Sequence, residues 1–365
     1  MQIAPFGLER WFDEYEHDAD IMLAESGIRS LSSDRFDTDP GELGYVIPTD
    51  GDPEFRADVA ARYDRAADEV CFTCGTQEAN FLAFLALLDE TAPDGADGGF
   101  GEGDHAVVVT PTYQALHAVP EAVGRVSRVP LEPPNWELNP DAVAEAVTDE
   151  TAVVVLNNPN NPTGRYHPPA VVDAIAEVAA DHGAYLLCDE VYRLLAEEPR
   201  EPVAKCYDHG ISTTSLTKAY GLAGTRFGWI AGPREVIEAA VRWKDYTTIS
   251  PSIFGQHVAR QALGDAEDEI IRENRALAAD HRDRVADFLD DRGLEWYDPV
   301  GVNGLVTVPD GFENGKDFCR TVVEEASVVL APGEYFGRPE YFRIGFGLPT
   351  DELEEGLARV GRVIG

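Results

Sequence analysis

The sequence is poor in lysine and has no long apolar run, and each shortage excludes a class of protein. Its 365 residues include only four lysines, at positions 205, 218, 244 and 316, against 67 acidic residues. No run of about eighteen apolar residues occurs, so we expect no transmembrane helix. The formal net charge of −38 is spread along the chain, which argues against nucleic acid or an anionic membrane as a partner.

The first twenty residues carry acids where a signal peptide has a basic and then an apolar segment. We therefore expect a cytoplasmic protein. Self-repulsion at this charge density weakens the compact state unless salt screens it. The 25 arginines, the few lysines and the acids on nearly every expected helix suggest adaptation to a high-salt cytoplasm. An acidic protein with no special habitat is the alternative.

Cysteine and histidine are also sparse. Five cysteines form no disulfide framework in a chain of this length. Cys71 and Cys74 have the spacing of a redox motif, but both fall in a β-type segment, where we expect two small buried side chains on opposite faces. None of the eight histidines has metal-ligand spacing with another, so the sequence indicates no metal site.

Short β-type segments, mostly separated by helical patterns, make up most of the chain. There are seven of them, at 69–73, 105–110, 125–130, 152–156, 184–188, 211–215 and 227–231. Continuous apolar segments such as 152–156 are typical of strands buried in a parallel sheet. The pattern predicts the α/β class, with a three-layer α/β/α domain around a mostly parallel seven-stranded sheet.

The chain is long enough to form two domains. From about residue 249 the pattern changes to helices and then to alternating strand and helix. We expect a large domain over 39–248 and a smaller α+β domain formed by 1–38 together with 249–365. The polar, glycine-rich segment 89–104 is expected to form a mobile surface loop.

One lysine stands where ligands bind in such a sheet, at the carboxyl end of an expected strand. Ser215 precedes Lys218 by three residues, and Arg226 follows it by eight. A partly desolvated lysine near another cation favours its neutral amine, which forms a Schiff base with an aldehyde or ketone. The planar donor fork of arginine suits phosphate oxygens. A surface lysine beside a glycine-rich turn is the alternative.

The segment from Ser215 to Trp229, SLTKAYGLAGTRFGW, resembles the cofactor-attachment segment of class I and II aminotransferases. The resemblance covers essentially the whole chain and implies the aspartate aminotransferase fold, which is fold type I. It also implies that the cofactor is pyridoxal 5'-phosphate (PLP). Lys218 would hold the cofactor covalently and act as the catalytic base, while Ser215 and Arg226 would bind its phosphate.

Other expected strand ends carry further polar groups. The turn Gly75, Thr76, Gln77 opens a helix whose free N–H groups favour phosphate, and the turn also matches a phosphate-binding turn of the family. Asn161 lies in the string NNPNNPTG, which resembles the family signature whose asparagine binds the ring hydroxyl oxygen of the cofactor. Asp189 follows a buried strand, and a carboxylate there keeps a pyridine nitrogen protonated. A helix N-cap is the alternative for Asp189.

Three tyrosines are further candidates for cofactor binding. Tyr113 follows a strand, so its ring could stack on a pyridine ring, although a core tyrosine is the alternative. Tyr192 lies three residues after Asp189, on the same side of the turn, and could hydrogen-bond the ring oxygen. The resemblance implies that Tyr45 crosses a homodimer interface to the cofactor phosphate of the neighbouring subunit. An ordinary interface aromatic is the alternative for Tyr45.

The substrate is expected to bind on the small-domain side of the site. Arg343 lies in an alternating segment and is placed as the substrate arginine of the family is; its fork fits an α-carboxylate. An ion-pair partner is the alternative for Arg343. Asn161 is also a candidate. The N-terminal arm of similar enzymes brings Ser26 or Gly27 near the substrate carboxylate, so Gly27 is a further candidate; a core or linker position is the alternative for both Ser26 and Gly27.

The leading function is transfer of an amino group from an amino acid to a 2-oxo acid by a homodimer with shared active sites. A lyase, decarboxylase, racemase or cyclising enzyme on the same scaffold would share Lys218, Asp189 and Asn161. A cofactor-binding regulator without turnover is disfavoured, because 1–39 contains no basic helix-turn-helix. The sequence marks no second arginine for a dicarboxylate substrate.

Overall fold

A computed structural model describes residues 2–45, 47–88 and 104–365. The segment expected to be a surface loop, 89–104, lies outside these ranges except for its last residue. No helix of the described residues is both long and apolar enough to cross a membrane.

The large domain is built on a seven-stranded sheet in the order β1-β7-β6-β5-β4-β2-β3. Its strands are β1 (Val70–Thr73), β2 (His105–Thr110), β3 (Arg125–Pro130), β4 (Thr151–Asn157), β5 (Tyr185–Asp189), β6 (Gly210–Ser215) and β7 (Gly228–Ala231). Adjacent strands from β6 to β3 are parallel, and β7 is antiparallel to both of its neighbours. The expected mostly parallel α/β sheet is therefore confirmed, with strand ends within two residues of the predicted ones.

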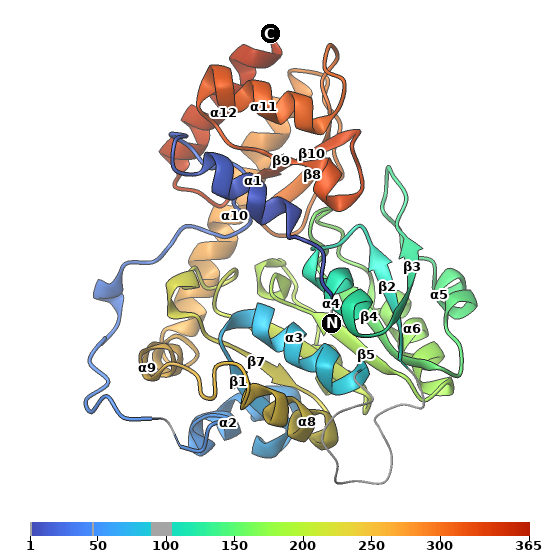
Figure 1. Ribbon diagram of the computed structural model, residues 1–365. Helices are drawn as coiled ribbons and strands as arrows, with labels where there is room; N and C mark the ends of the chain where they lie inside the picture. The colour runs from blue at the N-terminus through green and yellow to red at the C-terminus, as the bar shows by residue number, and fades with distance from the viewer. Residues whose placement is uncertain (1, 46, 89–103) are drawn as a thin grey trace.

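Helices cover both faces of this sheet, because successive side chains of each buried strand point to opposite sides. Along β4, Val153 and Val155 join one apolar cluster while Val154 and Leu156 join another. The first cluster packs under α3 (Gly75–Leu88), α4 (Ala115–Val123) and α8 (Arg234–Lys244). The second packs under α5 (Pro140–Ala146), α6 (Pro169–Asp181) and α7 (Val203–Cys206). The three predicted layers are visible in Figure 1.

The small domain contains a three-stranded antiparallel sheet in the order β8-β10-β9. These strands are β8 (Asn303–Thr307), β9 (Ala331–Pro332) and β10 (Tyr341–Gly345). Around them lie α1 (Gly7–Tyr15), α11 (Gly315–Ala326), α12 (Thr350–Ile364) and the long α10 (Glu267–Asp290), which runs down toward the large domain in Figure 1. Trp11 of α1 is buried and donates its indole N–H to the Leu330 carbonyl at 2.9 Å.

Two further helices, α2 (Pro53–Ala60) and α9 (Ile253–Ala262), lie low in Figure 1 beside the large domain. They are joined through Asp52, whose backbone N–H donates to Gln256 at 3.0 Å. The domain limits 39–248 and 249–365 stay a prediction. Short 3-10 turns complete the chain at η1 (Ser33–Arg35), η2 (Ala61–Tyr63), η3 (Ala67–Glu69), η4 (Arg193–Leu195), η5 (Ala223–Thr225) and η6 (Gly333–Phe336).

The expected burial of both Cys71 and Cys74 is only half right. Cys71 lies in β1 and is fully buried. Cys74 is partly exposed, because the strand ends at Thr73 and Cys74 belongs to the turn that follows. The pair therefore does not form two opposite faces of one strand.

The N-terminal arm reaches the site by packing its backbone on β10 and the residues after it. The N–H of Gly345 donates to the Leu23 carbonyl at 2.6 Å. A Cβ on Gly345 would lie 1.8 Å from the Glu25 carbonyl oxygen, and one on Gly347 would lie 1.9 Å from the Gly27 carbonyl oxygen. Only glycine allows so close an approach of two backbones. These contacts fix the segment from Leu23 to Gly27 between the two domains.

Candidate active site

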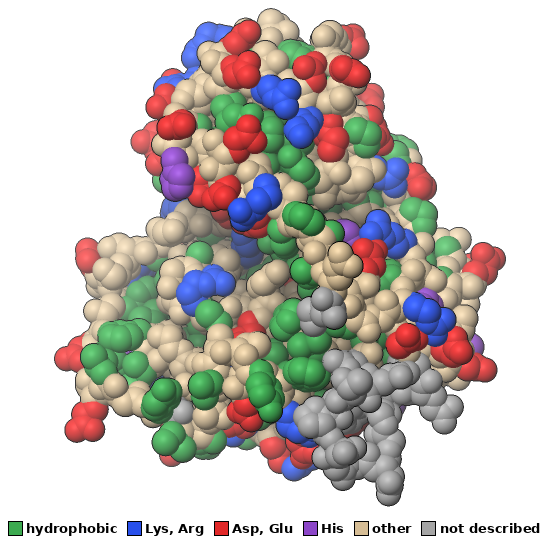
Figure 2. All heavy atoms as spheres, viewed as in Figure 1, with side chains coloured by type: hydrophobic (Ala, Val, Ile, Leu, Met, Phe, Trp, Pro, Cys, Tyr) green, Lys and Arg blue, Asp and Glu red, His purple; other side chains and the backbone are tan. Residues whose placement is uncertain are grey.

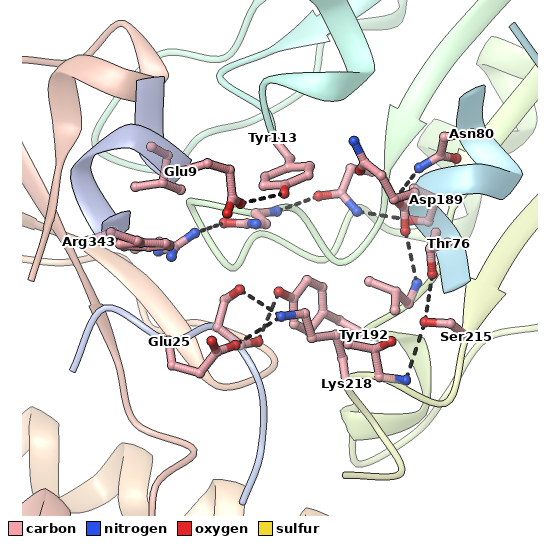
Figure 3. Close-up of a pocket in the computed structure, with 18 of the residues that line it drawn as sticks. Glu9, Glu25, Thr76, Asn80, Tyr113, Asp189, Tyr192, Ser215, Lys218 and Arg343 are labelled. Atoms are coloured by element: carbon pink, nitrogen blue, oxygen red, sulfur yellow. Dashed lines mark hydrogen bonds and ion pairs between the residues drawn. The ribbon is translucent and has the colours of Figure 1, made fainter. Parts of the chain in front are cut away.

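A cavity of about 340 Å³ lies at the carboxyl ends of the parallel strands, and the small domain and the N-terminal arm close its other side. Figure 3 shows its lining side chains. Most residues predicted from the sequence line it, namely Thr76, Gln77, Tyr113, Asn161, Asp189, Tyr192, Ser215, Lys218, Arg226 and Arg343. Gly75 lies next to this set. Gly27 and Tyr45 do not line the cavity.

One end of the cavity collects hydroxyl groups and a guanidinium. Thr76 at the start of α3 donates its hydroxyl to Ser215 Oγ at 2.7 Å, and the Thr217 N–H donates to the same oxygen at 3.3 Å. Arg226 donates to the backbone carbonyls of Ala223 and Cys74 at 3.1 and 3.5 Å. Hydroxyl donors, a helix start and a guanidinium together suit a phosphate group.

Gly75 makes this end possible. Its φ of +79° favours glycine, and a Cβ there would lie 2.8 Å from Nη2 of Arg226. Arg226 itself has a left-handed φ of +47°. The turn therefore brings the guanidinium against the start of α3, where a side chain at position 75 would hinder it.

The cavity also holds the carboxylate of Asp189, which is only 6% exposed. Asn80 of α3 donates its amide to Asp189 Oδ2 at 2.8 Å, and the Val191 N–H donates to Oδ1 at 3.2 Å. Thr213 of β6 donates its hydroxyl to Asn80 Oδ1 at 2.6 Å. Because Thr213 occupies the amide oxygen of Asn80, the amide nitrogen of Asn80 must face the carboxylate.

Burial raises the pKa of Asp189 to about 6, against the donors from Asn80 and Val191 and the charge of Lys218, which all lower it. The folded state therefore favours protonated Asp189 relative to the unfolded chain, in which the pKa of an aspartate is 3.8. This contribution to stability is full below pH 4 and is lost as the pH rises through about 6. A bound cation beside Asp189 would reverse this effect by favouring the carboxylate.

Lys218 lines the same cavity, and its environment differs from the one expected from the sequence. Its Nζ donates to Glu25 Oε1 at 3.1 Å and to Ser26 Oγ at 3.0 Å. Burial alone would lower the pKa of Lys218, but the carboxylate of Glu25 outweighs it and the pKa is raised. The expected neutral amine is therefore wrong for the cofactor-free protein, because the carboxylate of Glu25 acts on the lysine more strongly than the nearby cation Arg343.

Arg343 of β10 enters the cavity from the small domain and is 1% exposed. It donates to Asn161 Oδ1 at 2.9 Å and to the Ala24 carbonyl at 2.6 Å. Asn161 is itself held by the Asn157 side chain, which accepts from the Asn161 N–H at 2.6 Å. The structure therefore joins Asn161 and Arg343, which lie 182 residues apart in the sequence.

The tyrosines of the site take different positions. Tyr113 donates its hydroxyl to Glu9 of α1 at 3.3 Å, and its ring lies 5.1 Å from that of Phe6. Tyr192 donates to the Ser26 carbonyl at 3.0 Å. Tyr45 is 79% exposed. Tyr113 and Tyr192 therefore lie inside the cavity, whereas Tyr45 lies on the surface of this chain.

Several polar residues that line the cavity escaped the sequence reasoning, among them Glu9, Glu25 and Asn80. A signal existed for Asn80, because an amide interrupts the apolar sequence AN-FLAFLALL of α3. Glu25 likewise follows the apolar Ile21-Met-Leu-Ala24. Glu9 gave no signal, since it resembles any acid on an amphipathic helix.

These residues fit the cofactor implied by the sequence. A phosphate would lie between Arg226 and the start of α3, where Gly75 leaves room. The buried carboxylate of Asp189 suits a ring nitrogen that carries a proton. Lys218 lies in the same cavity, with a nucleophilic amine for an aldehyde. The donor set thus matches a phosphorylated pyridine aldehyde.

The chain is similar to known proteins over almost its whole length. A sequence model of the family described as aminotransferase class I and II matches residues 14–360. Capreomycidine synthase of Streptomyces vinaceus is 31% identical over 98% of this chain and 93% of its own length. Aspartate/prephenate aminotransferase of Thermus thermophilus is 28% identical over 97% of this chain and 89% of its own length.

A solved structure extends this similarity to three dimensions. A PLP-dependent aminotransferase from Streptococcus suis matches with a TM-score of 0.90 and 28% identity. The match covers 100% of this chain and 99% of the other. Both domains therefore take part in the likeness.

The site generates a prediction about Asn80. Asn80→Leu removes a donor to the Asp189 carboxylate, so the pKa of Asp189 should rise above about 6 in the cofactor-free protein. Infrared difference spectroscopy measures this pKa from the pH dependence of the carboxyl band of Asp189. The band is assigned by its loss in Asp189→Asn. Asn274→Leu removes another fully buried asparagine away from the cavity and should leave the pKa unchanged. An equal pKa in Asn80→Leu and the wild type would contradict the role of Asn80.

Proposed function

The chain belongs to the class I and II aminotransferases, and we propose that Lys218 is its catalytic base and Arg343 its substrate arginine. The protein is a PLP-dependent enzyme that transfers an amino group from an amino acid to a 2-oxo acid. The observation that carries the proposed roles is the convergence of Lys218, Asp189, Asn161 and Arg226 on one cavity. These residues come from three separate segments of the chain, since Lys218 and Arg226 share one of them.

Bound PLP supplies an aldehyde for the substrate amine and a ring that accepts the electron pair released at Cα. Lys218 Nζ takes the proton from the substrate Cα and later returns it. Its hydrogen bonds to Glu25 and Ser26 hold the amine in the cavity before it reacts. Asp189 keeps the ring nitrogen protonated, and Asn80 keeps Asp189 ionised and aimed.

The substrate α-carboxylate would lie against Arg343, whose guanidinium fits it in a bidentate manner. Asn161 shares a hydrogen bond with Arg343 and is also proposed to contact the ring oxygen of the cofactor. Tyr192 is proposed to contact the same oxygen, and Tyr113 to stack on the ring. Thr76, Gln77, Ser215 and Arg226 would hold the phosphate beside Gly75. Gly27 would lie near the substrate carboxylate.

The alternative function is a different reaction of an amino acid at the same site. Capreomycidine synthase is similar over nearly the whole chain, and its name is not that of an aminotransferase. A lyase, decarboxylase, racemase or cyclising enzyme would need the same Lys218, Asp189 and Asn161. The product formed from the cofactor therefore has to distinguish an aminotransferase from these other enzymes.

Lys218→Ala tests the leading function. An amino acid added to the wild-type holoenzyme without a 2-oxo acid should yield pyridoxamine phosphate, whereas Lys218→Ala should lose this half-reaction by at least about a thousandfold because it lacks the base. Chromatography of the released cofactor measures it. Lys205→Ala, at an exposed lysine, is the matched control. Ammonia or pyruvate released without pyridoxamine phosphate would favour a lyase instead.

We also propose a homodimer in which Tyr45 reaches the cofactor phosphate of the partner subunit. Large apolar side chains are exposed in this chain at Leu43 (70%), Tyr45 (79%) and Ile47 (81%). Tyr246 and Phe254 are exposed as well, and Figure 2 shows hydrophobic side chains on the face near α9. Burying such side chains against a second copy would remove apolar area from water.

The dimer has a direct test. Light scattering after gel filtration in molar KCl should give about twice the chain mass of 39.8 kDa. Ile47→Asp should shift the mass toward that of one chain, because a charge would enter the buried interface. Ala170→Asp, at an exposed position of α6, should keep the dimer. A single-chain mass for the wild type would rule out the proposed interface.

We further propose that the enzyme works in a cytoplasm rich in salt. The support is the formal charge of −38, and Figure 2 shows acidic side chains over both domains. Screening of this charge should raise the melting temperature between low and molar KCl, since the Debye length falls to about 3 Å at 1 M. Calorimetry at several KCl concentrations measures the change. A melting temperature that stays constant or falls would contradict the proposal.

A further inference from the structure

We propose that the amino-acid substrate carries a second cationic group at the end of its side chain, an ammonium or a guanidinium, and that Glu25 and Glu9 bind it. This substrate class rests on the proposed function of the cavity, in which Lys218 binds the cofactor and Arg343 the substrate α-carboxylate. The support comes from the charges that line the cavity and from their partners.

The described residues that line the cavity include three cations, Lys218, Arg226 and Arg343. Each has a proposed role, since Lys218 reacts with the cofactor aldehyde, Arg226 faces its phosphate, and Arg343 faces the α-carboxylate. The acids that line the cavity are more numerous: Glu9, Glu16, Glu25 and Asp189. Only Asp189 among them has a role toward the cofactor. With an anionic cofactor and an α-carboxylate bound, the cavity would therefore carry an excess of negative charge.

Glu25 shows why this excess matters. Its Oε1 accepts from Lys218 Nζ at 3.1 Å, and about half of its side chain (49%) is open to the cavity. Lys218 lowers the pKa of Glu25 first of all, with burial acting against it and Arg343 adding to it. Once Nζ is bound to the cofactor, it is no longer a free ammonium. The carboxylate of Glu25 then loses its cationic partner, and Arg343 is occupied by the substrate, so Glu25 is open to a new cation in the cavity.

Glu9 supplies a second carboxylate that lines the cavity. It lies on α1, where its Oε1 accepts from the Tyr113 hydroxyl at 3.3 Å, and the neighbouring Leu8 and Phe12 of α1 also line the cavity. Figure 3 shows Glu9 and Glu25 on opposite sides of the space beside Arg343. A side chain that extends from an α-carboxylate on Arg343 would enter that space.

Arg343 gives an independent sign that an anion completes this part of the cavity. It is 1% exposed, and its Nε has no hydrogen-bond partner among the described residues. A buried guanidinium with an unused donor is costly unless a ligand compensates it. An anion at Arg343 and a cation at Glu9 and Glu25 together describe a dibasic amino acid. A second substrate carboxylate would instead meet two glutamates.

The general acidity of the chain is the competing explanation for these glutamates. Exposed acids are strongly screened in molar salt, whereas charges inside a cavity are screened much less. Glu14 lies on the same helix as Glu9 and is exposed, but it does not line the cavity. The variant Glu14→Gln therefore carries the same change of charge without changing the site.

The test compares charged amino acids with neutral analogues of the same shape. The holoenzyme in molar KCl is titrated with L-arginine and L-citrulline, and with L-lysine and L-norleucine, and the shift of cofactor absorbance gives each dissociation constant. We expect at least one cationic member to bind about tenfold or more tightly than its neutral partner. The pair that shows the larger ratio identifies guanidinium or ammonium. Glu25→Gln and Glu9→Gln should reduce this ratio toward one, and Glu14→Gln should not.

Each other result decides against the inference. Neutral partners that bind as tightly as the cations, or L-aspartate that binds more tightly than both cations, would overturn it. A ratio that survives in Glu25→Gln and in Glu9→Gln would remove these residues as its cause. Absence of any absorbance shift with all five amino acids would instead contradict the proposed function. The wild-type comparison stands even if a variant fails to fold.

Discussion

Five adjacent parallel strands end at one edge of the sheet, and the site depends on this constraint. The strands from β6 to β3 are held in register by backbone hydrogen bonds and by two apolar cores. Polar residues at the ends of these strands, such as Asp189 and Ser215, are therefore brought to the same cavity. The hydrophobic burial that stabilises the sheet also sets the geometry of the chemistry.

A second constraint acts across the domains. The arm from Leu23 to Gly27 is held against Gly345 and Gly347 by backbone contact, and this contact places Glu25 opposite Lys218. The same β10 carries Arg343 into the cavity. The proposed substrate arginine and Glu25 thus belong to the small domain and the arm, whereas the proposed cofactor-binding residues belong to the large domain.

Charge competition decides how the individual groups behave. Burial raises the pKa of Asp189, and the donors from Asn80 and Val191 oppose this rise. Burial would lower the pKa of Lys218, and Glu25 reverses the direction. In both cases a side chain distant in sequence, Asn80 or Glu25, acts against the effect of burial on the pKa of a functional group. The acids of the cavity therefore shape its chemistry as well as its preference for a ligand.

The sequence by itself determined the fold class and ten of the residues that line the cavity. Strand periodicity is local, and residues such as Lys218, Asp189 and Asn161 lie at strand ends or in the turns that follow, so their positions and the family resemblance were enough to find them. Tertiary structure alone decided the partners. Asn80 faces Asp189 across 109 residues, and Glu25 faces Lys218 across 193. No local pattern encodes these pairs, because they form only when α3 and the N-terminal arm pack against the strand ends. Composition does not tell which polar or charged groups become neighbours in that packing.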